Sequence, residues 1–287
     1  MSIHTLVHDI YHMLETKDFP EGVSVDEECE RFGQEMAALL REQLQKEEDR
    51  AGRLRLSAIG KPDRQIYNAY KGVSGEKLKG PDYIKFLYGH IIEALVLALV
   101  RLAGHSVTDQ QKEVEVEGVK GHIDCYIDGR LVDVKSCSTY SYKKFRDNKL
   151  HEDDPFGYLA QLKSYAYAEG QELYAWLAMD KQNGHLCVLE YDERDKHADY
   201  YDAINWCPSV RVRQVKKMVS GESLPPLCYP DIEDGKSGNR RLDTGCAFCA
   251  FKHACWPGLQ TYAYANGVKH LTHVDRTPRV VKIPEDF

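Results

Sequence analysis

The chain has 287 residues, of which 43 % are apolar and 29 % are charged. This composition is that of a water-soluble globular protein and excludes collagen-like, disordered and disulfide-stabilised miniprotein classes. The net charge of -7 excludes a generally basic nucleic-acid-binding surface, although it allows a local basic groove. The longest apolar run, residues 94–100, is too short for a membrane helix of about 20 residues, and no Lys or Arg precedes an apolar stretch at the N-terminus. We therefore expect a cytoplasmic protein with no membrane partner.

The first half of the chain is predicted to be mainly helical. Apolar residues recur at helical spacing over residues 25–50, which indicates an amphipathic helix. Residues 82–103 form a second expected helix, and its middle is apolar on nearly every side, so we expect it to be buried. One acid, Glu93, lies inside that apolar stretch.

The second half alternates strands and helices. Asp-Gly at 128–129 and Asn-Gly at 183–184 are two-residue hairpin turns between apolar segments. A helix is expected from Asp154-Pro155 to about Glu169, further helix over 193–220, and a loop-rich tail from residue 221. The order of elements predicts an α/β fold with a central mixed β-sheet flanked by helices. The predicted strands cover residues 113–117, 120–127, 130–135, 173–180 and 185–191.

The first hairpin brings two acids together. Pairing across the 128–129 turn places Asp124 opposite Asp133 and His122 opposite Lys135, all on one face of the sheet. Facing carboxylates have Cβ atoms about 5 Å apart and repel each other. A divalent cation such as Mg²⁺ would offset this repulsion, and Lys135 could hold a water or stabilise negative charge beside it. The alternative interpretation is a solvent-exposed acidic face with an incidental lysine.

Two helical features add to this pattern. A buried Glu93 needs a partner, for which we weigh a metal ion against an arginine. Gln161 and Tyr165 lie four residues apart and so share one helix face. They could bind a phosphate or position the lysine, or the tyrosine could belong to an amphipathic core.

Together these residues resemble a known family. Glu93, Asp124, the Asp133-Val134-Lys135 run and a Gln-xxx-Tyr helix follow each other as in the PD-(D/E)xK nuclease superfamily, and the last motif points to its RecB-like exonuclease branch. Over roughly residues 53–257 the chain looks most like bacteriophage exonucleases of this branch. The resemblance implies a restriction-endonuclease-like core and hydrolysis of phosphodiester bonds from DNA ends, in phage replication, recombination or host-DNA breakdown.

The resemblance also implies roles for these residues. Glu93, Asp124, Asp133 and the carbonyl of Val134 would bind one or two Mg²⁺ or Mn²⁺ ions, which activate a water for attack on the phosphodiester. Lys135 would orient that water or help to deprotonate it. The amide of Gln161 and the phenol of Tyr165 would position the lysine or the DNA backbone. We accordingly expect an N-terminal helical segment (1–52), a nuclease core (53–220) and a C-terminal metal-cluster tail (221–287).

The tail contains three of the nine cysteines in a metal-binding pattern. Cys246, Cys249 and Cys255 have spacings that suit zinc or an iron–sulfur cluster, and either needs a fourth ligand. The pattern resembles the iron–sulfur element of the AddB nuclease domain and of RecB-like CRISPR adaptation nucleases. We favour a structural [4Fe–4S] cluster with Asp63 or Cys228 as fourth ligand, zinc being second and three free cysteines the remaining alternative. Cys29 and His253 are further candidates for the fourth position.

A basic segment after the predicted catalytic strand could bind DNA. Its cations alternate with aromatic residues, which suits phosphate contacts and base stacking on single-stranded ends. Solvated surface charge is the alternative, and the acidic residues over 26–49 would repel DNA elsewhere. The predicted DNA-binding residues are Lys143, Lys144, Arg146 and Lys149.

Competing functions follow from the same residues. A flap or junction endonuclease would use the same chemistry, whereas a non-catalytic DNA-end-binding module or a zinc-stabilised interaction protein would not. DNA ends or single strands are the expected partners, and a homo-oligomer or a recombination partner protein is compatible with the sequence.

Overall fold

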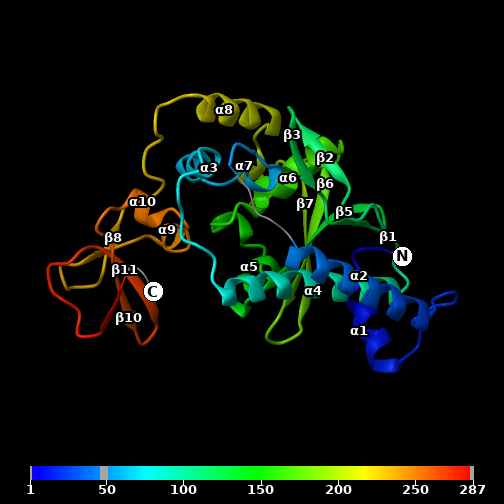
Figure 1. Cartoon of the computed structure of the whole chain (residues 1–287). Coiled ribbons are helices and arrows are strands. Elements are labelled where there is room, and N and C mark those ends of the chain that lie inside the picture. Colours follow the sequence, from blue (N-terminus) through cyan, green and yellow to red (C-terminus); the bar gives the residue numbers. More distant parts are fainter. Residues whose placement is uncertain (1, 46–50, 285–287) are drawn as a thin grey trace. The chain divides into compact units, whose positions relative to one another are not determined.

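The structure is a computed structural model that describes residues 2–45 and 51–284. The chain divides into two compact units, each described here by itself (Figure 1). The first unit comprises residues 1–49, 54–60 and 79–213, and the second comprises 50–53, 61–78 and 214–287.

A five-stranded mixed sheet forms the centre of the first unit. Its order is β1-β4-β5-β6-β7, and β5 and β6 run parallel while the other neighbours are antiparallel. The parallel pair is possible because the segment between β5 and β6 carries two helices and is long enough for a crossover. The predicted α/β class with a central mixed sheet is confirmed. The strands are β1 (Val107–Thr108), β4 (Cys125–Ile127), β5 (Arg130–Cys137), β6 (Leu173–Asp180) and β7 (Leu186–Asp192).

Helices cover both faces of this sheet. On one face, apolar side chains of α1 (Leu6–Thr16) and α4 (Gly80–Leu102) pack on alternate residues of β5 and β6. On the other face lie α5 (Thr139–Arg146) and α6 (Tyr158–Ala168), whose residues contact Trp176 and Asp133. Helix α2 (Val25–Gln45) packs along α4, and residues 46–50 of the predicted N-terminal helix lie outside the described residues. The short helices are η1 (Leu56–Ala58), η2 (Leu150–Glu152) and α7 (Tyr201–Ile204).

The first hairpin has the predicted register but a shorter first strand. Ile127 pairs with Arg130 and Cys125 with Val132, as the Asp-Gly turn requires. The predicted pairing of His122 with Lys135 is wrong, because the strand is interrupted at residues 123–124. His122 instead lies opposite Glu113, in a separate two-stranded sheet of β2 (Glu113–Val116) and β3 (Val119–His122).

The sheet face that carries Asp133 is buried. Leu131 is fully buried and Asp133 is 1 % exposed. Strand β5 lies between β4 and β6 in the middle of the sheet, and α6 covers this face. The interpretation of Asp133 as part of a solvated acidic surface is therefore excluded.

Helix α4 is buried over part of its length only. Its residues 96–100 lie mostly in the core, but Tyr83, Phe86 and Tyr88 in its first half are about half exposed, contrary to the burial predicted for this helix. By length and composition α4 is apolar enough to cross a membrane, with a mean hydropathy of 1.7. Core helices of globular proteins share these properties, and here the second half of α4 packs on the sheet.

Helix α6 begins later than predicted. Asp154 does act as a cap, but its two carboxylate oxygens accept hydrogen bonds from the backbone N–H groups of Tyr158 and Leu159 (3.0 and 2.8 Å). Gly157 stands before the first helical residue with a φ of 76°. Residues 155–157 therefore form a turn, and α6 starts at Tyr158.

The second unit contains a sheet where we predicted a loop-rich tail. Five antiparallel strands take the order β12-β10-β11-β9-β8. Three of these strands have only two or three residues, too few for a pattern of alternating polarity to reveal them. The elements of this unit are α3 (Asp63–Tyr70), the end of α8 (Pro208–Ser220), β8 (Ile232–Glu233), β9 (Arg240–Arg241), α9 (Thr244–Ala247), α10 (Lys252–Cys255), β10 (Gln260–Tyr264), β11 (Gly267–His273) and β12 (Val281–Ile283).

Candidate active site

Strand β5 supplies the centre of the candidate site. Asp133 and Lys135 lie two residues apart on the sheet face that α6 covers, and Val134 points into the opposite core. The ammonium of Lys135 lies 2.7 Å from Oδ2 of Asp133. Oδ2 nevertheless has no hydrogen-bond partner of good geometry, so this buried oxygen keeps an unused lone pair.

Asp124 reaches the same place from the end of the neighbouring strand. It directly precedes β4, so β4 has no residue left to pair with Val134. The carboxylate of Asp124 takes over this role, and its Oδ2 accepts a hydrogen bond from the backbone N–H of Val134 at 2.8 Å. The last pair of β4 with β5 is Cys125 with Val132, so the predicted pair of Asp124 with Asp133 lies one position beyond the paired residues.

Glu93 is the third carboxylate and comes from α4. It is partly buried, and its Oε1 accepts a hydrogen bond from the amide of Gln111 at 3.0 Å. Its charge interacts with those of Asp133 and Lys135. The sequence did not predict the role of Gln111, because no motif around this residue connects it with Glu93, which lies 18 positions earlier in the chain.

The three carboxylates hold their protons more strongly than isolated acids do. Burial and the charge of Asp133 raise the pKa of Glu93 to about 7. Burial, Asp133 and Glu93 together raise the pKa of Asp124, and burial raises that of Asp133. Burial opposes the charge on Lys135, but the carboxylates of Asp133 and Asp124 outweigh it and raise the ammonium's pKa. The site thus concentrates more negative charge than one lysine neutralises.

Helix α6 holds these groups in place. The amide of Gln161 contacts Oδ1 of Asp133 at 3.4 Å and the hydroxyl of Tyr165 at 3.3 Å. The Lys135 ammonium lies 4.9 Å from the ring centre of Tyr158, a cation–π contact that sequence reasoning missed. Tyr158 lies three residues before Gln161 on the same helix face, and that spacing is the signal that could have identified it.

The packing of Tyr165 depends on a glycine in β3. A Cβ atom at Gly121 would lie 2.6 Å from the Tyr165 ring and 3.0 Å from Leu56. We expect Gly121→Ala to displace this ring and lower the free energy of unfolding by about 1–3 kcal/mol. Urea denaturation measures this loss. Gly129→Ala in the hairpin turn serves as a comparison, because a Cβ atom there meets no neighbouring atom and only the φ of 77° is strained. A Gly121→Ala variant as stable as the wild type would contradict the close contact.

The described residues include no group of three or more His, Cys, Asp or Glu side chains already arranged to hold a metal ion. The donor set nevertheless suits Mg²⁺ or Mn²⁺, which prefer carboxylate oxygens. Oδ2 of Asp133 is buried and contacts the Lys135 ammonium without good hydrogen-bond geometry, while Asp124 and Glu93 accept hydrogen bonds from Val134 and Gln111. A bound cation would require the last two carboxylates to share or exchange these partners.

Most of the predicted DNA-binding cations have partners within the protein. Lys144 pairs with Asp153 at 2.5 Å, Arg146 with Asp147 at 2.7 Å, and Lys149 with Glu152 at 4.0 Å. Lys143 is exposed and has no carboxylate partner among the residues that the structure describes. Of the four, Lys143 is thus the one whose charge is available without breaking an ion pair.

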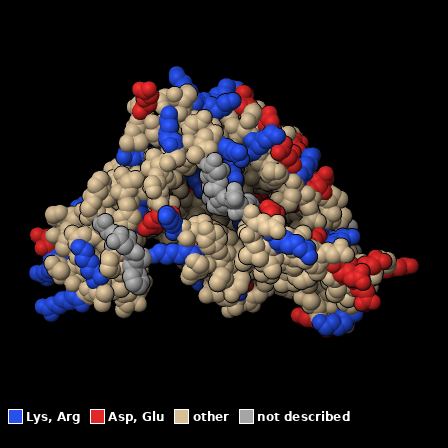
Figure 2. Space-filling model, viewed as in Figure 1, with Lys and Arg blue, Asp and Glu red and all other residues tan. Residues whose placement is uncertain are grey.

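Acidic residues gather at the N-terminal helices. Asp26, Glu27 and Glu28 stand in the first turn of α2. Figure 2 shows a concentration of acidic side chains at the end of the first unit where α1 and α2 lie in Figure 1. This surface would repel a polyanion, and residues 46–49 of the predicted acidic run lie outside the described residues.

The C-terminal cysteines lie together in the second unit. Cys246 belongs to α9 and Cys255 to α10, with Cys249 between them. Burial and the nearby charges of Cys228 and Cys249 raise the pKa of the Cys246 thiol to about 11, and Cys228 acts likewise on Cys249. Four cysteines therefore lie within electrostatic range of one another.

Helix α3 contributes hydrogen-bond donors to this group. Backbone N–H groups of Arg64 and Gln65 donate to the thiol of Cys228, and the Asn68 amide donates to Sγ of Cys255 at 3.8 Å. Of the other candidates for a fourth ligand, Cys29 is exposed on α2, and the His253 ring lies 3.2 Å from Glu76. Asp63 is the first residue of α3.

The sequence matches no protein-family profile and no curated protein. Among solved structures, the fold is similar to a protein named SSO0001, with 14 % identity and a TM-score of 0.41 over 78 % of this chain and 95 % of that one. It is also similar to an alkaline exonuclease from Laribacter hongkongensis, with 12 % identity and a TM-score of 0.34 over 60 % of this chain and 91 % of that one. A phage-related exonuclease from Haemophilus somnus 129PT is similar with 16 % identity and a TM-score of 0.34 over 58 % of this chain and 90 % of that one.

Proposed function

We propose that the protein is a divalent-metal-dependent deoxyribonuclease that hydrolyses DNA from its ends. The observation that carries this proposal is the meeting of three buried or partly buried carboxylates with one lysine at Asp133. Surplus negative charge of this kind is costly without a cation. A Mg²⁺ or Mn²⁺ ion would remove that cost and is the usual catalyst for phosphodiester hydrolysis.

Glu93, Asp124, Asp133 and the carbonyl of Val134 would hold the metal. When bound, it would lower the pKa of a coordinated water and neutralise charge on the phosphate. Because the neighbouring carboxylates raise its pKa, Lys135 stays an ammonium. It can donate a hydrogen bond to the attacking water or to a phosphate oxygen, but it has no free lone pair with which to take a proton. We therefore propose electrostatic stabilisation as its role, rather than the help with deprotonation that the sequence also allowed.

The neighbouring side chains of α6 would maintain this geometry. Gln161 bridges Asp133 and Tyr165, which limits rotation of the carboxylate. The ring of Tyr158 lies beside the ammonium and keeps it over the site. We propose that DNA reaches the site past Lys143, with ends or single strands as substrates.

A nuclease assay tests the proposal directly. Linear end-labelled DNA is incubated with the wild type, Asp133→Asn and Lys135→Ala in Mg²⁺, in Mn²⁺ and in EDTA. We expect mononucleotide or short products from the wild type with metal and almost none from the others. Lys196→Ala removes an exposed lysine elsewhere in the first unit and serves as control. Activity in EDTA, or full activity in Asp133→Asn, would refute the metal site.

The shape of the substrate separates exonuclease from endonuclease. An exonuclease leaves covalently closed circular DNA intact and degrades the same molecule once it is linear. Cutting of circular single strands, or of flaps and junctions at internal positions, would favour a structure-specific endonuclease. Tight binding of DNA ends without hydrolysis under all metal conditions would favour a non-catalytic end-binding module.

Metal binding is expected to depend on pH. The pKa of Glu93 is raised from its ordinary 4.5 to about 7, so between these values the folded protein binds more protons than the unfolded chain. Without metal, stability therefore falls as pH rises through this window. Mn²⁺ competes with these protons and binds the folded state, so it should raise the unfolding temperature more at pH 8 than at pH 5.5. Thermal unfolding with and without Mn²⁺ measures the shift at each pH, and Asp124→Asn should reduce the difference between the two shifts. Equal shifts at pH 5.5 and pH 8 would contradict the expected competition between Mn²⁺ and protons.

We propose, second, that Cys228, Cys246, Cys249 and Cys255 hold a structural [4Fe–4S] cluster, with zinc as the alternative. Hydrogen bonds from Arg64, Gln65 and Asn68 to the sulfurs support it, since cluster thiolates accept such bonds. Protein purified without oxygen should be brown, with absorbance near ~400 nm. Cys228→Ser should reduce bound iron and Asp63→Ser should not. The reverse result would assign the fourth ligand to Asp63, and colourless protein with zinc would favour the zinc alternative.

A further inference from the structure

The second unit contains a pocket that the nuclease proposal does not use. It has a volume of about 830 Å³ and lies between two loops of the C-terminal sheet. One loop is the β8–β9 turn, residues 234–239, and the other is the segment between β11 and β12. The lining residues are Asp234, Lys236, Ser237, Asn239, Tyr264, Arg276, Thr277, Pro278 and Arg279.

The side chain of Asn239 joins the two loops. It is 3 % exposed, and its Oδ1 accepts hydrogen bonds from the backbone N–H groups of Asp275 and Arg276 at 2.9 and 2.8 Å. Its amide nitrogen donates to the carbonyl of Arg276 at 2.8 Å. Three bonds from one buried side chain fix the position of the Arg276 backbone, so the pocket is preformed.

Glycine and serine complete the turn on the other side. Gly238 has a φ of 80°, and a Cβ atom there would lie 2.5 Å from a carboxylate oxygen of Asp275. Ser237 Oγ donates to the carbonyl of Asp234 at 2.8 Å. These contacts bring the β8–β9 turn directly against the second loop and leave the Lys236 side chain at the pocket.

The charge of the pocket is positive and unbalanced. Lys236, Arg276 and Arg279 are exposed, and none has a carboxylate within ion-pair distance among the residues that the structure describes. Other cations of the same sheet are neutralised: Arg240 lies 2.7 Å from Asp231, and Lys269 lies 2.7 Å from Asp234. Asp234 is the carboxylate among the lining residues and is already paired with Lys269, so it does not balance the three cations of the pocket.

We propose that this pocket binds phosphate esters, as a site separate from the carboxylates of the first unit. Two arginines and a lysine around one cavity suit phosphate oxygens, which arginine binds through two parallel hydrogen bonds. The Tyr264 ring in the lining offers a surface for a sugar or base. The phosphate can belong to the backbone of a nucleic-acid strand or to a free nucleotide, and the experiment distinguishes these sources.

The test measures binding of a labelled 20-nucleotide oligo-dT to the full chain in EDTA, so that its outcome does not depend on cleavage. Arg276→Gln with Arg279→Gln should weaken binding about tenfold at low salt. The slope of log K against log salt is negative, and each phosphate contact to a single strand contributes about 0.7 to its magnitude. The slope of the double variant should therefore be less steep than that of the wild type by about 1.4. Arg276→Lys with Arg279→Lys keeps the charge and should keep most of the slope.

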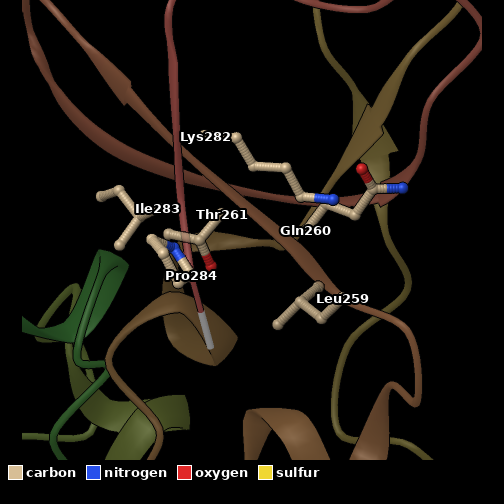
Figure 3. Close-up of a pocket in the computed structure, with 6 residues that line it drawn as sticks. All are labelled: Leu259, Gln260, Thr261, Lys282, Ile283 and Pro284. Atoms are coloured by element: carbon tan, nitrogen blue, oxygen red, sulfur yellow. The ribbon is translucent and has the colours of Figure 1, made fainter. Parts of the chain in front are cut away.

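Lys282 provides a matched control on the same sheet. It is exposed on β12 and lines a different pocket of about 340 Å³, where its side chain extends toward Gln260 (Figure 3). Lys282→Gln should leave the oligonucleotide affinity within about twofold of the wild type. An effect as large as that of the double variant would mean that general surface charge binds the strand, and would overturn the site.

Competition with inorganic phosphate and with dTTP identifies the source of the phosphate. If dTTP displaces the oligonucleotide from the wild type and does not bind the double variant, the pocket is a nucleotide site. No displacement together with the expected salt slope supports a strand backbone. Unchanged affinity and slope in the double variant overturn the proposal, and they do so whether or not the carboxylate site proves to be a nuclease.

Discussion

The Lys135→Ala variant should hydrolyse linear DNA about 10²–10³ times more slowly than the wild type under saturating Mg²⁺, which is the loss expected for one preorganised charge at a reacting group. The ammonium lies 2.7 Å from Asp133 and is held beside the Tyr158 ring. Since its pKa is raised, its charge is constant over the working pH range. The defect should therefore appear in kcat at every pH rather than as a shift of the pH profile.

Metal binding separates this role from a structural one. Removal of the ammonium leaves three carboxylates without a cation, so Mn²⁺ should stabilise Lys135→Ala at least as much as the wild type in thermal unfolding. Lys135→Met, which keeps an unbranched side chain of nearly the same length without the charge, should show the same loss of kcat. A variant with kcat within threefold of the wild type, or one that no longer responds to Mn²⁺, would contradict the proposed role.

The sequence determined the arrangement of the acids because a two-residue turn fixes register. Once Asp128-Gly129 forms the turn, Cys125 must pair with Val132, and Asp124 and Asp133 occupy the next position. The same rule failed two residues further on, because it assumes an uninterrupted strand. The chain leaves β4 at Asp124, whose side chain replaces a strand neighbour of Val134, and so His122 pairs elsewhere.

Contacts that depend on tertiary packing could not be predicted. Gln111 reaches Glu93 from a loop, and no local pattern connects the two. Burial of the Asp133 face depends on α6 crossing the sheet after a parallel strand, which a hairpin pattern does not contain. The α6 residues were predictable as a group because helical spacing places Tyr158 beside Gln161, although its contact with Lys135 was not.

A buried histidine joins the N-terminal helix to the β4–β5 hairpin. The His105 side chain is fully buried, with Nδ1 2.6 Å from Asp128 and Nε2 3.1 Å from Asp9 of α1. The ring donates to both carboxylates only when both nitrogens carry protons. Asp128 also accepts from the Ser106 backbone N–H at 3.0 Å, so one network fixes the hairpin turn and helix α1.

We expect His105→Ala to lower the free energy of unfolding by about 3 kcal/mol, the lower end of the range for a broken buried ion pair, because Asp9 is partly exposed. Urea denaturation of the wild type and His105→Ala measures this loss. Ala in place of His12, an exposed residue one turn further along α1, should change stability by less than about 0.5 kcal/mol. A cycle with Asp9→Asn should show coupling, since each change removes the same contact.

The dependence on acid provides a second readout of the same network. Hydrogen bonds from Thr5, His8 and His105 lower the pKa of Asp9. Burial raises the pKa of Asp128, but hydrogen bonds from His105 and Ser106 outweigh it and lower that pKa. Both carboxylates therefore stabilise the fold above their ordinary pKa of 3.8, and this contribution disappears as pH falls through their lowered values. His105→Ala should lose less stability than the wild type between pH 5 and pH 2. Parallel pH profiles for the two proteins would show that the imidazole does not hold these carboxylates.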